Sequence, residues 1–218
     1  MRTVPLALAF VAATSIGLLA VKSGPVSGSS DSPGTPVTPQ MMSIDAFNSG
    51  LKHLTNGDKA GASLKAADQK KSLGEYGSAL KDFQKAVKLD PKNYKAFNGL
   101  GYAYRKSGDY AKALDSYSEA LKLSPNFPDA IEYRGEAYLG LNRPEDAKQA
   151  YLQLFAGSRT HADLLLKAMK TWADKRHADP AGVDPAALAT FEGWLHERAA
   201  LAERTVEMAR NTPQGTWR

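Results

Sequence analysis

The sequence contains no cysteine and lacks the residue patterns typical of enzymes. Disulfides, thiolate metal sites and cysteine nucleophiles are therefore excluded. The four histidines, His53, His161, His177 and His196, include no pair spaced three or four residues apart, the spacing that puts two metal ligands on one helix face. Glycine-rich phosphate loops and the Gly-x-Ser-x-Gly nucleophile motif are also missing. We therefore expect no catalytic residues, no metal and no cofactor.

The chain also lacks a strong excess of one charge. Its 28 Lys and Arg residues against 23 Asp and Glu residues give a formal charge of +5 over 218 residues. A protein that binds nucleic acid through phosphate contacts usually carries a much denser basic surface. We therefore do not expect a nucleic-acid partner.

Residues 1–40 differ in composition from the rest of the chain. After Arg2, an uncharged run from Val4 to Val21 ends at Lys22, and as a helix it would reach ~27 Å, slightly less than the ~30 Å of a hydrocarbon core. Residues 1–22 therefore fit either a cleaved signal peptide or an N-terminal membrane anchor. Residues 23–40, rich in Ser, Gly and Pro, are typical of a flexible linker. Both alternatives predict export, and we expect the bacterial periplasm, with the chain anchored to the inner membrane or released from it.

A period of 34 residues follows. Residues 74–80 and 108–114 are similar, and the similarity continues between residues 86–91 and 120–125. A third and weaker copy occupies residues 142–147. A repeat of this length indicates stacked helical hairpins.

The sequence resembles the tetratricopeptide repeat family, with units at residues 60–93, 94–127 and 128–161. The resemblance implies an all-α fold, a right-handed superhelix of antiparallel helix hairpins over residues 41–159, with C-terminal capping helices over residues 160–218. The middle unit fills the signature positions of the family with Phe97, Leu100, Gly101, Tyr104, Ala113, Tyr117, Ala120 and Pro125.

The expected hairpins are closed by short links. Gly108 suits the end of one helix and Asp109 can cap the next, while the small Gly101 allows the two helices to approach closely. Similar links are expected at residues 56–58, after a helix over 41–54, and at residues 74–75, after a helix over 59–72. The first unit departs from the family in its first helix, where Ser63, Ala66, Ala67 and Lys70 replace large apolar residues.

Two further helices are expected after the third unit. The first spans residues 161–176, and the second begins at Asp184 and Pro185. The second helix has two possible roles, to cap the apolar end of the stack or to form a dimer interface. Its apolar positions recur at steps of three and four, namely Leu188, Phe191, Leu195, Ala199, Ala202, Val206 and Ala209.

The family resemblance implies a protein or peptide partner held in a concave groove lined by the first helix of each unit. The unit charges of +3, +2 and −1 predict a groove that changes from basic to acidic along the array. We expect an acidic group of the partner near Lys95 and Arg105 and a basic group near Glu132 and Glu136. The predicted groove residues are Lys95, Asn98, Tyr102, Arg105, Lys106, Asp129, Glu132 and Glu136.

One subfamily does not fit. Repeat domains that bind the C-terminal carboxylate of cytosolic chaperones carry Lys, Asn and Arg at fixed groove positions. The matching positions here hold Leu64, Asp68, Gly99, Asp129 and Tyr133. We therefore expect an exported, membrane-tethered adaptor that scaffolds assembly in the bacterial envelope, with a self-assembling structural component as the alternative.

Overall fold

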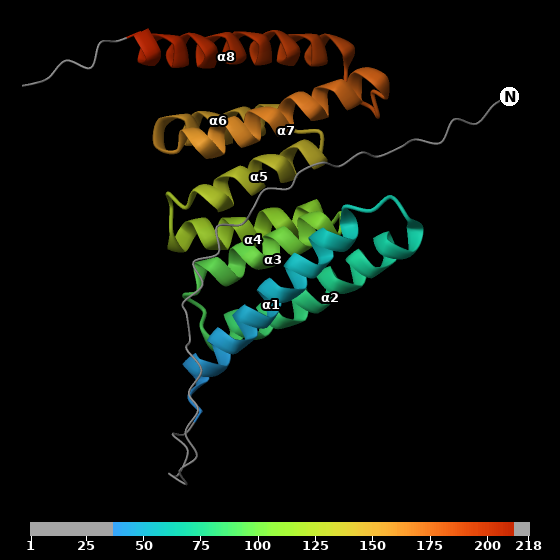
Figure 1. Ribbon diagram of the computed structural model, residues 1–218, viewed down its shortest axis with the longest axis vertical. Coiled ribbons are helices and arrows are strands. Elements are labelled where there is room, and N and C mark those ends of the chain that lie inside the picture. The colour runs from blue at the N-terminus through green and yellow to red at the C-terminus, as the bar shows by residue number, and fades with distance from the viewer. Residues whose placement is uncertain (1–36, 212–218) are drawn as a thin grey trace, which may run out of the picture. The chain divides into compact units, whose positions relative to one another are not determined.

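The computed structural model describes residues 37–211, which form eight α-helices and no strand (Figure 1). They fall into two compact units, one ending at Lys92 and the other beginning at Asn93. No helix within residues 37–211 is long and apolar enough to cross a membrane. The predicted signal peptide or anchor over residues 1–22, and most of the predicted linker over 23–40, lie outside the described residues.

The first unit is a hairpin of two long helices, α1 (Pro39–Gly61) and α2 (Ala66–Leu89). Helix α1 starts where the Thr38 hydroxyl accepts a hydrogen bond from a main-chain N–H of the first turn. The helices approach closely where a glycine faces an aromatic ring, because a Cβ at Gly50 would lie 2.8 Å from the Phe83 ring and a Cβ at Gly57 would lie 2.6 Å from the Tyr76 ring. Glycine here provides room for packing.

Two links expected from the sequence are wrong. Residues 56–58 lie inside α1 and residues 74–75 lie inside α2, so the turn falls at residues 62–65 instead. Gly57 serves the packing of the Tyr76 ring, and Gly74 does not adopt the left-handed conformation of a turn glycine. Glu75 accepts a hydrogen bond across the hairpin from His53 at 2.7 Å, so it does not cap a new helix. Residues 60–93 thus hold the end of α1, the turn and α2, without a second hairpin of their own.

The second unit begins with the hairpin predicted in most detail, α3 (Tyr94–Lys106) and α4 (Tyr110–Leu123). Gly108 adopts a φ of 85°, which favours glycine, and the Asp109 carboxylate accepts from the Lys112 N–H at 3.2 Å. Gly101 lies directly under the ring of Tyr117, leaving no room for a side chain. The predicted link and the predicted close approach are both confirmed.

The next hairpin joins α5 (Pro128–Gly140) to α6 (Pro144–Gly157). Its turn uses Asn142 at a φ of 55°, one of the few residue types that tolerate this conformation without being glycine. Gly135 lies beneath the side chain of Leu165, which comes from the following helix. The close approach at this position therefore serves packing between α5 and α7 as well as within the hairpin.

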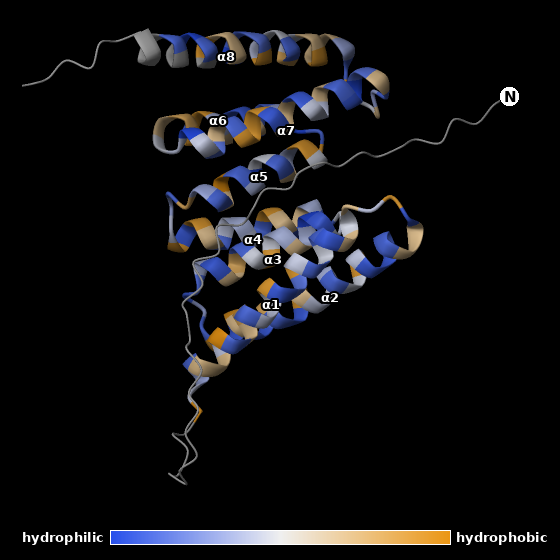
Figure 2. Cartoon of the chain, in the orientation of Figure 1, coloured by the Kyte–Doolittle hydropathy of each residue, from blue (hydrophilic) through white to orange (hydrophobic). Residues whose placement is uncertain are grey.

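Two more helices, α7 (Arg159–Ala178) and α8 (Pro185–Asn211), complete the second unit (Figure 1). Helix α8 begins as expected, with the Asp184 carboxylate accepting from a main-chain N–H of the first turn. Leu188, Phe191 and Leu195 are buried in the apolar core that runs from α4 to α8. Figure 2 shows orange and blue residues interleaved along α8, as expected for a helix with one apolar face. Helix α8 therefore covers the end of this core.

Candidate binding face

The first helices of successive hairpins, α3, α5 and α7, pack side by side, with α5 in contact with both α3 and α7. Their polar side chains gather on a surface that we call the first-helix face. The face consists of Asn98, Tyr102, Arg105, Asp129, Glu132, Tyr133, Glu136 and His161.

Arg105 lies at the centre of a rigid cluster on this face. Its Nη1 donates to the Glu136 carboxylate at 2.5 Å, and its guanidinium lies 5.0 Å from the ring centroid of Tyr102 and 5.1 Å from that of Tyr133. The two tyrosine rings meet edge to face at 5.2 Å. Burial alone would lower the pKa of Arg105, but the Glu136 carboxylate more than offsets this and raises it. Arg105 is therefore a fixed cation whose charge is already matched within the chain.

Glu132 has the opposite situation, since it is a buried acid without a donor. Only 3% of the residue is exposed, and none of the hydrogen bonds in the described residues reaches its carboxylate. Burial raises its pKa from 4.5 to about 8, and the charges of Glu136 and Asp129 add to this effect while Arg105 opposes it. Such a group is costly to keep ionised.

His161 is the basic group nearest to Glu132, but its hydrogen bonds are used elsewhere. Its Nδ1 lies 2.7 Å from the Ser158 hydroxyl, and its Nε2 lies 3.3 Å from Asp129 Oδ1. Nε2 can donate to Asp129 while Nδ1 pairs with the Ser158 hydroxyl, so both ring nitrogens have partners. The Glu132 carboxylate lies 4.0 Å from Nε2, beyond hydrogen-bond distance.

The other predicted groove residues lie around this centre. Lys95 is exposed, and Lys106 is half-buried with its Nζ 5.8 Å from the Tyr102 ring centroid. Asn98 is partly buried, and its Oδ1 is a buried acceptor without a hydrogen-bond partner. The spacing from Asn98 to Tyr102 and Arg105, four and seven residues, places all three on one face of α3.

Two residues of the face were not among the predicted groove residues. Tyr133 stacks against the Arg105 cluster and His161 holds Asp129 in place. His161 belongs to the helix after the last repeat, where the 34-residue pattern has ended, so the register of the repeat gave no signal for it.

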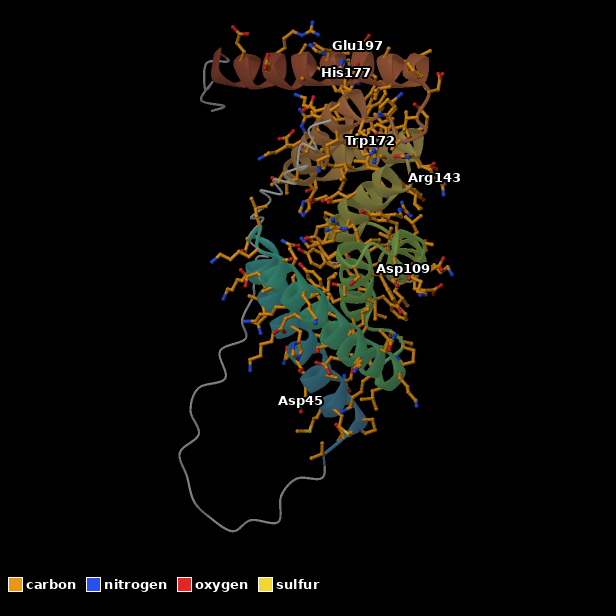
Figure 3. All side chains as sticks on the ribbon, turned by 90° about the vertical axis from the view of Figure 1, so that its right-hand side faces the viewer. Asp45, Asp109, Arg143, Trp172, His177 and Glu197 are labelled. Atoms are coloured by element: carbon orange, nitrogen blue, oxygen red, sulfur yellow. The ribbon has the colours of Figure 1, made fainter. Side chains whose placement is uncertain are left out.

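The turns between paired helices form a different surface. Asp109 and Arg143, labelled in Figure 3, start α4 and α6 and lie along the same edge of this unit. Each forms an exposed ion pair with the residue three positions later in the sequence. Asp109 pairs with Lys112 at 2.7 Å, and Arg143 pairs with Asp146 at 2.9 Å. Contacts of this kind stabilise helix ends and create no binding site.

Comparison with protein families identifies the repeats. The tetratricopeptide repeat family matches residues 64–131 and, in a second match, residues 104–169. The chain is a tetratricopeptide repeat protein. Its packing agrees with this family, because the signature positions Gly101 and Tyr117 make the close contact of the α3–α4 hairpin. A comparison with curated proteins gives no match to this tetratricopeptide repeat protein.

Solved structures of other tetratricopeptide repeat proteins are similar at low sequence identity. The second such domain of human RPAP3, in complex with an HSP70 peptide, is 21% identical over 60% of this chain and 97% of that one, with a TM-score of 0.47. The domain of Arabidopsis OM64 is 16% identical over 58% of this chain and 98% of that one, with a TM-score of 0.43. The MamA protein is 17% identical over 80% of this chain and 98% of that one, with a TM-score of 0.44.

No group of three or more His, Asp or Glu side chains is arranged to hold a metal ion within residues 37–211. The acids of the first-helix face are instead engaged with arginine and histidine, apart from Glu132. The arrangement can offer hydrogen-bond acceptors and an aromatic surface to a polypeptide.

Proposed function

We propose that this tetratricopeptide repeat protein is a non-enzymatic adaptor that binds a protein or peptide partner on its first-helix face. The observation that carries the proposal is the preformed cluster of Tyr102, Arg105, Tyr133 and Glu136. Tyrosine and arginine are the residue types that contribute most to protein interfaces. Because these side chains already hold one another in place, a partner binding there would lose little side-chain entropy.

We further propose that the adaptor serves as an assembly or scaffolding factor of the bacterial cell envelope. The support is the uncharged run from Val4 to Val21, which is consistent with export to the periplasm either as an anchor in the inner membrane or as a cleaved signal peptide. The polar segment that follows would separate the helical units from the membrane.

The alternative of a self-assembling structural component is less well supported. The first part of the apolar side of α8, which would form a dimer, is packed inside the chain. The ring centroids of Phe191 and Trp172 are 5.4 Å apart, and those of Trp194 and Tyr151 are 5.3 Å apart. The side chains of Ala202, Val206 and Ala209 lie outside the described ones.

Photo-crosslinking in cells tests the binding face. A photoreactive amino acid introduced at Lys95 or Asn98 is expected to capture one discrete partner. Matched control positions are Glu119 on α4 and Leu152 on α6, the second helices of their hairpins. The side chain of Glu119 is 47% exposed, and residue Leu152 is 43% exposed. Capture of the same partner from the control positions with equal yield would contradict binding at the first-helix face.

A further inference from the structure

Among the described residues, three of the four polar or charged residues that are buried have side chains hydrogen-bonded within the chain. The four buried polar or charged residues are Ser43, Ser72, Ser116 and Glu132. Each of the three serine hydroxyls donates to a main-chain carbonyl, at 2.8 to 3.0 Å. Glu132 is the exception among the four, because its carboxylate receives no hydrogen bond.

No donor of the surrounding side chains that the structure describes lies within hydrogen-bond distance of the Glu132 carboxylate. Arg105 Nη1 donates to Glu136 while the buried Arg105 Nε makes no hydrogen bond, and His161 Nε2 lies 3.3 Å from Asp129 Oδ1. Three carboxylates, those of Asp129, Glu132 and Glu136, therefore share a surface on which a single permanent cation is paired with one of them. On α3, the amide oxygen of Asn98 is a second buried acceptor that lacks a donor.

The ionised form of a carboxyl group buried in these surroundings is stabilised by a cation with N–H groups. An unpaired buried charge is destabilising, whereas a charge that is paired and hydrogen-bonded is not. An acidic partner group would be repelled by three carboxylates, and an apolar group would leave Glu132 and the Asn98 amide oxygen unsatisfied. A lysine or arginine side chain supplies both the positive charge and several donors.

We propose that the segment bound on the first-helix face inserts a lysine or arginine side chain between α3, α5 and α7, where it binds Glu132 together with Asp129. This inference rests on the proposed function and specifies the chemistry of the partner. It differs from the sequence-based expectation for Arg105, which is occupied by Glu136 and thus contributes no free positive charge for an acidic partner group. The group that selects the partner is the Glu132 carboxyl, which ionises when the incoming cation pairs with it.

The net charge of the second unit would not by itself attract a basic peptide. Residues 93–211 contain sixteen Lys and Arg and sixteen Asp and Glu, so this unit carries no net charge at neutral pH. The basic excess of the chain lies in residues 1–92 and at Arg218. A basic peptide is therefore not attracted by the overall charge, and its binding would depend on the local arrangement of acids.

A displayed library of random twelve-residue peptides, selected on the immobilised full-length chain, tests this proposal. We expect the selected peptides to share a lysine or arginine at one position. A fluorescent copy of a selected peptide should bind Glu132→Gln at least tenfold more weakly than the wild type, and acetylation of the shared lysine should cause a similar loss. Glu119→Gln, on the outer surface of α4 and paired only with Lys122, is the matched control and should bind as the wild type does.

The possible failures can be distinguished. Glu132→Gln removes the ability of the buried side chain to ionise and keeps its shape, so we expect it to fold, which circular dichroism would verify. Peptides whose binding is unaffected by Glu132→Gln but altered by Asn98→Arg would overturn this inference and leave the proposed function intact. Binding that neither substitution changes would mean that the first-helix face is not the binding surface, and the proposed function would then fail as well.

Discussion

The α1–α2 hairpin and the α3–α8 repeats differ in whether their buried polar groups have hydrogen-bond partners. In the hairpin, Ser43 and Ser72 donate to carbonyls of the opposite helix, and the Tyr76 hydroxyl donates to Asp58 at 2.6 Å. In the repeats, Ser116 is hydrogen-bonded to a carbonyl of its own helix, but Glu132 and the amide oxygen of Asn98 are left without donors. The comparison indicates that the polar groups of the hairpin contribute to stability, whereas Glu132 and Asn98 leave acceptors that the fold itself does not use.

Two glutamates make this contrast measurable. The hydrogen bond from His53 lowers the pKa of Glu75, whereas burial raises the pKa of Glu132 to about 8. An acid with a raised folded-state pKa keeps its proton in the folded state while the unfolded state ionises. The free energy of unfolding therefore falls with rising pH between about pH 4.5 and 8, by up to about 1.4 kcal/mol per pH unit.

The largest expected effect is thus the removal of this pH dependence by Glu132→Gln. The variant should be more stable than the wild type at pH 8, by an amount that shrinks as the pH is lowered to 5. Urea unfolding followed by circular dichroism at several pH values measures the difference. Glu75→Gln is the comparison variant and should show no gain at pH 8, because its ionised form is the one stabilised by the fold. An equal gain in both variants would remove the distinction between the two regions.

The next effect concerns two glycines of opposite surroundings. Gly101→Leu should lower the free energy of unfolding by about 1–3 kcal/mol, because the side chain would overlap the Tyr117 ring. Gly74→Leu makes the same change on α2, where a Cβ would meet no atom within 4 Å, and should not destabilise the chain. Thermal unfolding of both variants tests the pair, and equal melting temperatures would contradict the packing of the α3–α4 hairpin.

Two buried tyrosines provide a smaller difference. Tyr76→Phe removes the hydrogen bond to Asp58 and should cost about 1 kcal/mol. Tyr117→Phe removes a hydroxyl that makes no hydrogen bond and should change stability less. Urea midpoints of the two variants give the comparison, which fails if Tyr117→Phe is the more damaging substitution.

The smallest effect is expected from adding a methyl group to a helix. Gly74→Ala should stabilise α2 by about 0.5–1 kcal/mol, because the site is open and alanine favours the helix. Gly108→Ala, at the equivalent position of the next repeat, should instead destabilise the α3–α4 turn, since its φ of 85° disfavours a side chain. The two melting temperatures should move in opposite directions.

The α3–α4 hairpin could be predicted closely because its determinants are local. Gly108 and Asp109 are adjacent in sequence, and together they fix where one helix ends and the next begins. The turn of the α1–α2 hairpin could not be predicted in this way. Gly57 looks like a turn residue until Tyr76, nineteen residues later, is seen to occupy the space above it.

The first-helix face was predictable in outline only. The 34-residue register correctly assigned Glu132 to the first helix of its unit and Arg105 to the preceding one. The absence of a donor at Glu132 depends on two pairings, Arg105 with Glu136 and His161 with Asp129, which join residues about thirty positions apart. Such pairings follow from the packing of three helices, which residue spacing within one helix does not determine.

The packing of α7 against α8 determines what tryptophan fluorescence can report. Trp172 and Trp194 lie in these two helices, on either side of Phe191, and the third tryptophan of the chain, Trp217, is later still. Residues 1–171 contain no indole. The intrinsic emission of the protein is therefore a local signal for separation of its last two helices, while the amide bands in the far ultraviolet record the melting of all eight.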